Sequence, residues 1–279
     1  MIANLVSEHG IRTSIHGQAN LEIAKRHIEK GKPLFVIANH FDKFDPAVAI
    51  KAISQFVTSV DGAYVFISQR QLDYFVNGIA MKAYAENLGF IPVPVIQPKD
   101  QPVYDSLKNI GKDQQEKSGI VFDAVKRKLT LKKAKQKLIE HEKNGTEPKE
   151  HAKSAIPMDL IKKLKRGERV VIFIWPEGTR SKTGGLLQAA DGIGRLLSIN
   201  KEAMVLPFSL ENKKIKLGRT VTEAVVGTPF TYADIQKDKE ERVTLGYPLE
   251  DADYALLRVG DNLTDESRGV YSRFPKKTT

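Results

Sequence analysis

The sequence predicts an α/β fold in which a largely parallel mixed sheet is flanked by helices. Two observations carry this prediction. Short apolar runs, bounded by polar or turn residues, are typical of buried strands at 34–38, 63–68, 169–175 and 204–208. Segments with apolar residues at helical spacing lie between them, beginning with residues 20–30 and 46–55. Strands that alternate with helices in this way build parallel sheets.

The remaining elements follow the same alternation. A helix is expected near residues 73–87 and another near 186–200, and a strand is expected at 221–226. Residues 89–95 are rich in β-formers, but Pro92 and Pro94 cannot donate backbone hydrogen bonds, so an edge strand or an extended segment is expected there. Residues 1–18 carry little pattern, and a polar tail is expected from about Thr264.

The composition narrows the class of function. The 279 residues carry a formal net charge of +10, which favours anionic partners such as phosphorylated substrates, anionic lipid or nucleic acid. The chain has no cysteine, so disulfides, thiolate metal sites and a cysteine acyl-enzyme are excluded. No two of the six histidines have the i, i+4 spacing of a helical zinc pair, so we expect no metal site and no bound cofactor.

A charged, helix-prone stretch interrupts the alternation at about residues 97–160. Residues 126–137 alone hold seven Lys or Arg and no acidic residue. We therefore expect one domain over 1–279 with a basic helical insertion at 97–160. Its region 120–140 suits an anionic membrane surface, and it equally suits a solvated helical hairpin. No apolar run reaches 18 residues and the N-terminus lacks a signal-peptide pattern, so a cytoplasmic protein, peripheral on the membrane face, is expected.

The first candidate site lies where the strand at 34–38 ends. Asn39 and His40 follow it, and Asp45-Pro46 has the pattern of a helix start. A histidine and an aspartate across such a short loop suit a general base oriented by a carboxylate. Each residue also suits a structural role, with Asp45 as a helix cap and His40 in a turn.

The second candidate site follows the strand at 169–175 and holds Glu177, Gly178, Thr179, Arg180 and Ser181. Ligand sites in open α/β sheets gather at the carboxyl ends of strands. The Arg180 guanidinium matches phosphate, the hydroxyls add donors, and Gly178 lets the backbone approach a ligand. Glu177 would repel phosphate, so it is expected to hold Arg180 or to accept a substrate hydroxyl. A plain turn with a Glu/Arg surface pair is the structural alternative.

Other catalytic motifs are absent from the sequence. Gly192-Ile193-Gly194 lacks the third glycine of a dinucleotide fingerprint, and Gly111-Lys112 lacks the hydroxyl residue of a P-loop. No Gly-x-Ser-x-Gly elbow occurs, which counts against an α/β-hydrolase. Aromatic residues do not interleave with the basic run at 126–137, so nucleic acid is not an expected partner.

In this order, the two clusters resemble the conserved blocks of the glycerolipid acyltransferases, the family of 1-acylglycerol-3-phosphate and glycerol-3-phosphate acyltransferases. Its Asn-His-x-x-x-x-Asp block is matched by Asn39, His40 and Asp45. Its Phe-Pro-Glu-Gly-Thr-Arg-Ser block is matched from Pro176 to Ser181, with Trp175 in place of Phe. Two weaker blocks are similar to Gly89-Phe90-Ile91 and to Val205-Leu206-Pro207, so the resemblance covers about residues 34–209.

The resemblance implies a glycerolipid acyltransferase-like fold and an O-acyltransferase. His40 would take the proton of a glycerol hydroxyl and Asp45 would orient its imidazole. The donor would be acyl-CoA or acyl carrier protein (acyl-ACP), used as a co-substrate. The leading acceptor is 1-acylglycerol-3-phosphate, which would give phosphatidic acid in phospholipid biosynthesis. Glu177, Gly178, Thr179, Arg180 and Ser181 would bind the phosphorylated glycerol or lysophospholipid acceptor.

Departures from the family pattern leave other readings open. The arginine that usually ends the second block is replaced near Val95, which favours an acceptor such as another lysolipid or a glycolipid. The spacing between the second and third blocks is long, in keeping with an insertion. A non-catalytic basic protein that binds lipid or nucleic acid on this scaffold is the remaining alternative.

Overall fold

The computed structural model divides the chain into two compact units, residues 1–94 with 156–279, and residues 95–155. It describes residues 4–8, 11–40, 45–68, 75–76, 79–95, 156–178, 184–189, 192–214, 220–243 and 249–276. All of these except Val95 belong to the first unit. Of the predicted basic insertion at 97–160, residues 97–155 lie outside the described residues. The insertion therefore stays a prediction.

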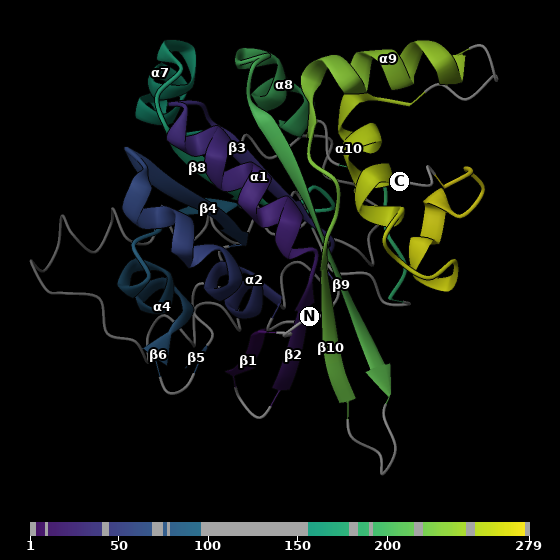
Figure 1. The fold of residues 1–279 in the computed structure, drawn as a ribbon, viewed down its shortest axis with the longest axis horizontal. Helices are drawn as coiled ribbons and strands as arrows, with labels where there is room; N and C mark the ends of the chain where they lie inside the picture. The colour runs from purple at the N-terminus through teal and green to yellow at the C-terminus, as the bar shows by residue number, and fades with distance from the viewer. Residues whose placement is uncertain are drawn as a thin grey trace, which may run out of the picture. The chain divides into compact units, whose positions relative to one another are not determined.

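Nine strands of the described residues form one sheet (Figure 1). Its order is β1 (Asn4–Glu8), β2 (Ile11–His16), β10 (Thr220–Val226), β9 (Met204–Lys214), β3 (Leu34–Ala38), β8 (Val170–Ile174), β4 (Gly62–Ser68) and β7 (Ile91–Val95), with β11 (Phe230–Thr231) paired to β9. The central strands β9, β3, β8 and β4 are parallel neighbours, and β2 pairs parallel to β10. The β1–β2, β9–β10 and β9–β11 pairs are antiparallel. The predicted mixed sheet is confirmed.

Helices cover both faces of this sheet. On one face, α1 (Gln18–Glu29) and α2 (Asp45–Ile53) pack against alternate strand residues such as Leu34, Val36 and Phe173. On the other face, α10 (Asp251–Gly260) packs against β9, where the Ser209 hydroxyl donates a hydrogen bond to the Val259 carbonyl at 2.7 Å. Every residue of β3 and β8 is therefore buried, because both faces of these strands are covered.

Six more helices lie among the described residues. They are η1 (Ser54–Ser59), α4 (Met81–Asn87), α7 (Met158–Arg166), α8 (Gly192–Ile199), α9 (Tyr232–Val243) and η4 (Glu266–Tyr271). Among the described residues, no helix is long and apolar enough to cross a membrane.

Two expected helices are shorter than predicted. In place of a helix over 73–87, β5 (Phe75–Val76) and β6 (Ile79–Ala80) pair antiparallel, and α4 begins only at Met81. In the sequence, Asn77-Gly78 lies between the paired residues and is a dipeptide typical of two-residue hairpin loops. The helix was predicted from the spacing of apolar residues, which gave no weight to this dipeptide. The helix expected over 186–200 begins at Gly192, because backbone donors from Leu186 to Ala189 bind other partners.

The two ends of the chain hold structure that the sequence pattern did not predict. Residues 4–8 and 11–16 form the antiparallel strands β1 and β2 at one sheet edge. The expected polar tail from about Thr264 is wrong, because η4 follows and Tyr271 and Phe274 are buried. The predicted edge position of residues 89–95 is confirmed, since β7 ends the strand order.

Candidate active site

Asn39 fixes the chain where β3 ends. Its side-chain nitrogen donates to the Leu210 carbonyl at 2.8 Å, and its side-chain oxygen accepts from the Leu210 backbone N–H at 2.7 Å. Ala38 already pairs with Phe208 on β9, so the Asn39 amide continues the strand pairing in place of backbone. This double bond to β9 sets the position from which the next residue, His40, leaves the sheet.

His40 and Glu177 meet at the carboxyl ends of two neighbouring strands. β3 and β8 are parallel and in register up to Ile37 and Ile174, so the residues that follow them lie side by side. The His40 backbone N–H donates to Glu177 Oε1 at 2.8 Å. Both residues are 7% exposed. The structure thus brings together two predicted clusters that lie 137 residues apart in the chain.

Glu177 ties His40 to a third segment. Its second oxygen, Oε2, accepts the Leu187 backbone N–H at 2.9 Å. The carboxylate thus binds backbone N–H groups of two segments, at His40 and at Leu187. The expected substrate-binding role of Glu177 stays a prediction. The geometry adds a role that the sequence did not indicate, which is to hold the backbone of the histidine.

Gly178 has the left-handed conformation that glycine favours. Its φ is +62°, and its N–H donates to the Trp175 carbonyl at 3.1 Å, which closes a turn directly after β8. A Cβ at this position would meet no described atom within 4 Å. The need for glycine therefore comes from the backbone conformation and not from crowding.

The other predicted site residues are described less fully. Asp45 begins α2, in agreement with the predicted helix start, but its side chain lies outside the described structure. Thr179, Arg180 and Ser181 lie outside the described residues, and their expected roles stay predictions. Among the described residues, no group of three or more His, Asp or Glu could hold a metal ion.

Trp175 borders His40 and is not among the predicted site residues. Its ring centroid lies 6.0 Å from that of His40, with 47° between the planes, and 4.4 Å from that of Phe173. The side chain is 7% exposed, and its Nε1 atom is buried without a hydrogen-bond partner among the described residues.

The C-terminal part of the chain holds the segment that Glu177 binds. The Leu186 N–H donates to the Ser267 carbonyl and the Val270 N–H donates to the Leu186 carbonyl, both at 3.0 Å. Gly269, with φ +52°, allows this approach, since a Cβ there would lie 2.2 Å from the Leu186 oxygen. A positive-φ glycine cannot be told from an ordinary loop glycine in the sequence, so the contact was missed.

The buried residues Tyr271 and Asp253 bind the same segment at Ala189. The Tyr271 hydroxyl donates to Asp253 Oδ1 at 2.6 Å and accepts the Ala189 N–H at 3.1 Å. The same N–H also lies 3.2 Å from Asp253 Oδ1. Burial, followed by the neighbouring Asp253 carboxylate, raises the pKa of Tyr271 far above its usual value, so the hydroxyl stays a donor at any ordinary pH.

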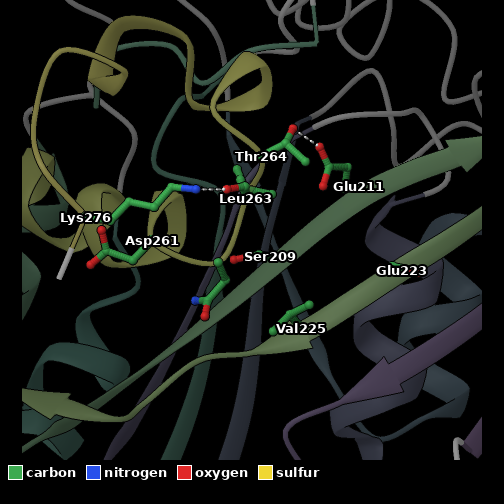
Figure 2. A pocket seen from close by; sticks show the side chains of 9 residues that line it. Ser209, Glu211, Glu223, Val225, Asp261, Leu263, Thr264 and Lys276 are labelled. Atoms are coloured by element: carbon green, nitrogen blue, oxygen red, sulfur yellow. Dashed lines mark hydrogen bonds between the residues drawn. The ribbon is translucent and has the colours of Figure 1, made fainter. Parts of the chain in front are cut away.

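A cavity of about 350 Å³ lies between β9, β10 and the chain after α10 (Figure 2). In Figure 2, Lys276 donates to the Leu263 carbonyl and the Thr264 hydroxyl donates to Glu211. Ser209 lines the cavity, whereas its neighbours Phe208 and Leu210 face the opposite side of the sheet, because successive strand side chains alternate. None of the predicted site residues lines this cavity.

A family model described as acyltransferase matches residues 15–211, which is more than half of the chain. The matched segment includes His40, Glu177, the strands that carry them and the Leu210 backbone that holds Asn39. It ends before α9, α10 and η4. No curated protein matches the chain.

Proposed function

From the premise that this chain belongs to the glycerolipid acyltransferase family and is an acyltransferase enzyme, we propose that it acylates 1-acylglycerol-3-phosphate to phosphatidic acid. The acyl donor is a thioester, acyl-CoA or acyl-ACP. The observation that carries the proposal is the 2.8 Å bond from the His40 N–H to Glu177, because it joins the base segment and the acceptor-binding segment in one site.

His40 acts as the general base in the proposed reaction. The acceptor hydroxyl oxygen forms a bond to the thioester carbonyl carbon while its proton passes to the imidazole. The carbonyl electron pair moves onto the oxygen, which gives a tetrahedral intermediate. When the carbonyl forms again, the C–S bond breaks and the thiolate takes the proton from the imidazolium. The products are an ester and a free thiol, and no acyl-enzyme is needed in a chain without cysteine.

The remaining roles follow from the two motifs. Asp45, at the start of α2, orients the imidazole and stabilises its protonated form. Arg180 pairs with the acceptor phosphate through its guanidinium fork, and Thr179 and Ser181 add hydroxyl donors. Gly178 gives the turn that presents these residues after β8. Positioning of this kind supplies several kcal/mol of a barrier, about 7–11 at best.

The proposed place of action is the cytoplasmic membrane face, where lysophospholipid acceptors reside. The net charge of +10 and the basic region 120–140 support peripheral binding to anionic lipid. Flotation of the purified chain with vesicles of neutral lipid, and with vesicles that also contain an anionic lipid, tests this. Binding that does not depend on the anionic lipid would contradict it.

A product screen tests the proposed reaction. The purified chain is incubated with 1-acylglycerol-3-phosphate, glycerol-3-phosphate or lysolipids with other head groups, each with mixed acyl-CoA and acyl-ACP donors. Mass spectrometry should show phosphatidic acid as the dominant new product. The absence of acyl transfer in every combination would overturn the proposal.

A second acceptor class is supported by Val95. The residue ends β7 at the position where the family pattern usually has a phosphate-binding arginine. Preferred acylation of a lysolipid with another head group, or of a glycolipid, would favour this candidate in the same screen. The non-catalytic alternative loses its support, since the chain belongs to an enzyme family.

A further inference from the structure

We propose that the indole N–H of Trp175 donates a hydrogen bond to the carbonyl oxygen of the acyl donor and stabilises the negative charge that develops there. This inference rests on the proposed function, because it assigns a donor for the oxygen of the thioester that His40-assisted attack makes tetrahedral. Preorganised donors at such an oxygen are a major source of rate acceleration in acyl transfer.

The burial of Trp175 is the first observation. Its side chain is 93% buried, yet Nε1 has no hydrogen-bond partner among the described residues. An indole nitrogen can only donate, and a buried donor without an acceptor is costly, so most buried tryptophans find one. A residue that only packed against Phe173 and His40 would not need this donor, since phenylalanine offers the same ring contact. Since this N–H has no acceptor among the described residues, we infer that a ligand supplies one.

The position of Trp175 is the second observation. It lies between the end of β8 and Glu177, and its ring centroid is 6.0 Å from that of His40. A general base lies about 3 Å from the hydroxyl oxygen, and that oxygen attacks a carbonyl carbon about 3 Å away. The carbonyl oxygen in a reactive complex is therefore within about 7 Å of the imidazole. The indole ring centroid lies within the same range of distances from the imidazole as this oxygen.

The step is balanced without any additional reactant. As the hydroxyl oxygen bonds to the carbonyl carbon, the electron pair moves to the carbonyl oxygen, which accepts the Trp175 N–H while it carries negative charge. The pair returns when the C–S bond breaks. The indole keeps its proton throughout, as expected of a donor that does not ionise.

Kinetics of Trp175→Phe give the first test. The variant keeps an aromatic ring beside Phe173 and His40 and removes only the donor and part of the ring. We expect kcat to fall on the order of 10²-fold while KM stays within about twofold, because the bond is strongest in the transition state. Phe173→Leu is the matched control, since it alters packing against the indole and removes no donor. An unchanged kcat in Trp175→Phe would overturn the inference.

The wild-type chain gives a second test that needs neither turnover nor a folded variant. Trp175 is the single tryptophan, so the protein has one indole N–H signal in a ¹⁵N–¹H correlation spectrum. Two inert donor analogues are compared, a ketone in which CH₂ replaces the thioester sulfur, and a thioether that lacks the carbonyl oxygen. The ketone should move the indole proton downfield and the thioether should not. Equal shifts with both, or no shift with either, would overturn the inference.

The two arms separate this inference from the proposed function. If the wild-type chain forms phosphatidic acid but the ketone does not shift the indole proton signal, the proposed function stands and the role of Trp175 fails. If the ketone shifts the signal but none of the acceptors is acylated, the carbonyl contact stands and the proposed acceptor fails.

Discussion

Glu177→Gln is expected to lower both the stability and the activity of the enzyme. Glu177 is buried, and its two oxygens accept the backbone N–H groups of His40 and Leu187 at 2.8 and 2.9 Å. Glutamine has nearly the same shape but only one acceptor oxygen, and its NH₂ group is a donor. One of the two backbone N–H groups must therefore face another donor in the variant.

The size of the effect follows from this single lost bond. Leaving a buried donor unsatisfied costs about 1–3 kcal/mol, so we expect the free energy of unfolding to fall by about 2 kcal/mol. The backbone of His40 also loses its tether, or shares it with Leu187. A shift of the base by about 1 Å can cost on the order of 10²-fold in rate, so kcat should fall by more than the change in stability explains.

Urea unfolding of the full chain measures the first effect and steady-state acyl transfer the second. Glu202→Gln is the matched control, because Glu202 forms an exposed pair with Lys32 at 3.2 Å and should change stability by less than about 0.5 kcal/mol. If Glu177→Gln unfolds at the wild-type midpoint and retains wild-type kcat, the carboxylate does not hold the histidine and the reasoning fails.

Three further changes probe other parts of the molecule. Arg180→Ala should raise KM for 1-acylglycerol-3-phosphate with little change in kcat, because it removes ground-state binding of the phosphate; an unchanged KM refutes that role. Tyr271→Phe should lower the free energy of unfolding by about 1–2 kcal/mol, because the hydroxyl bonds to Asp253 and Ala189 are lost. Hydrogen exchange at the Ala189 amide should become faster, since this amide loses an acceptor; exchange as slow as in wild type would contradict the role of Tyr271. Burial lowers the pKa of His27 below 6.5, so the unfolded chain binds the proton more readily and stability should fall as pH drops from above 6.5 through the folded-state pKa. His27→Gln keeps a donor for the Pro33 carbonyl, and the free energy of unfolding from urea should change less between about pH 7.5 and about pH 5.5 than in wild type. An equal change in both proteins would show that His27 is not the group responsible.

The central strands could be predicted because both of their faces are covered. β3 and β8 are continuous apolar runs of five residues, a pattern that few other structures explain. By contrast, β9 continues to Lys214 through polar residues, where pairing with β10 decides the conformation and side-chain polarity does not. Backbone pairing of this kind leaves no apolar pattern in the sequence.

The bond between His40 and Glu177 could not be predicted from the sequence. The sequence placed His40 and Glu177 each after a buried strand, and the structure shows that these strands are parallel neighbours. The contact itself uses the backbone N–H of His40, which every residue type except proline offers, so no side-chain pattern could indicate it. Trp175 was seen only as a substitute for phenylalanine, because an unpaired N–H becomes visible only when the surrounding atoms are known.

The hydrogen bonds that fix residues 186–189 were the least predictable feature of the site. They join these residues to Asp253, Ser267 and Tyr271, which lie beyond the matched family segment. Alternating charges around these positions suggested a polar tail. The burial of Tyr271 depends on folding back over a segment more than 80 residues earlier in the chain.

Acyl transfer by His40→Ala tests the central claim most directly. The alanine keeps the backbone N–H that binds Glu177, so the unfolding midpoint should stay close to that of wild type. We predict that formation of phosphatidic acid from 1-acylglycerol-3-phosphate and a thioester donor falls by on the order of 10³-fold, as expected for the loss of a general base. Turnover within about tenfold of wild type in the folded variant would contradict the account.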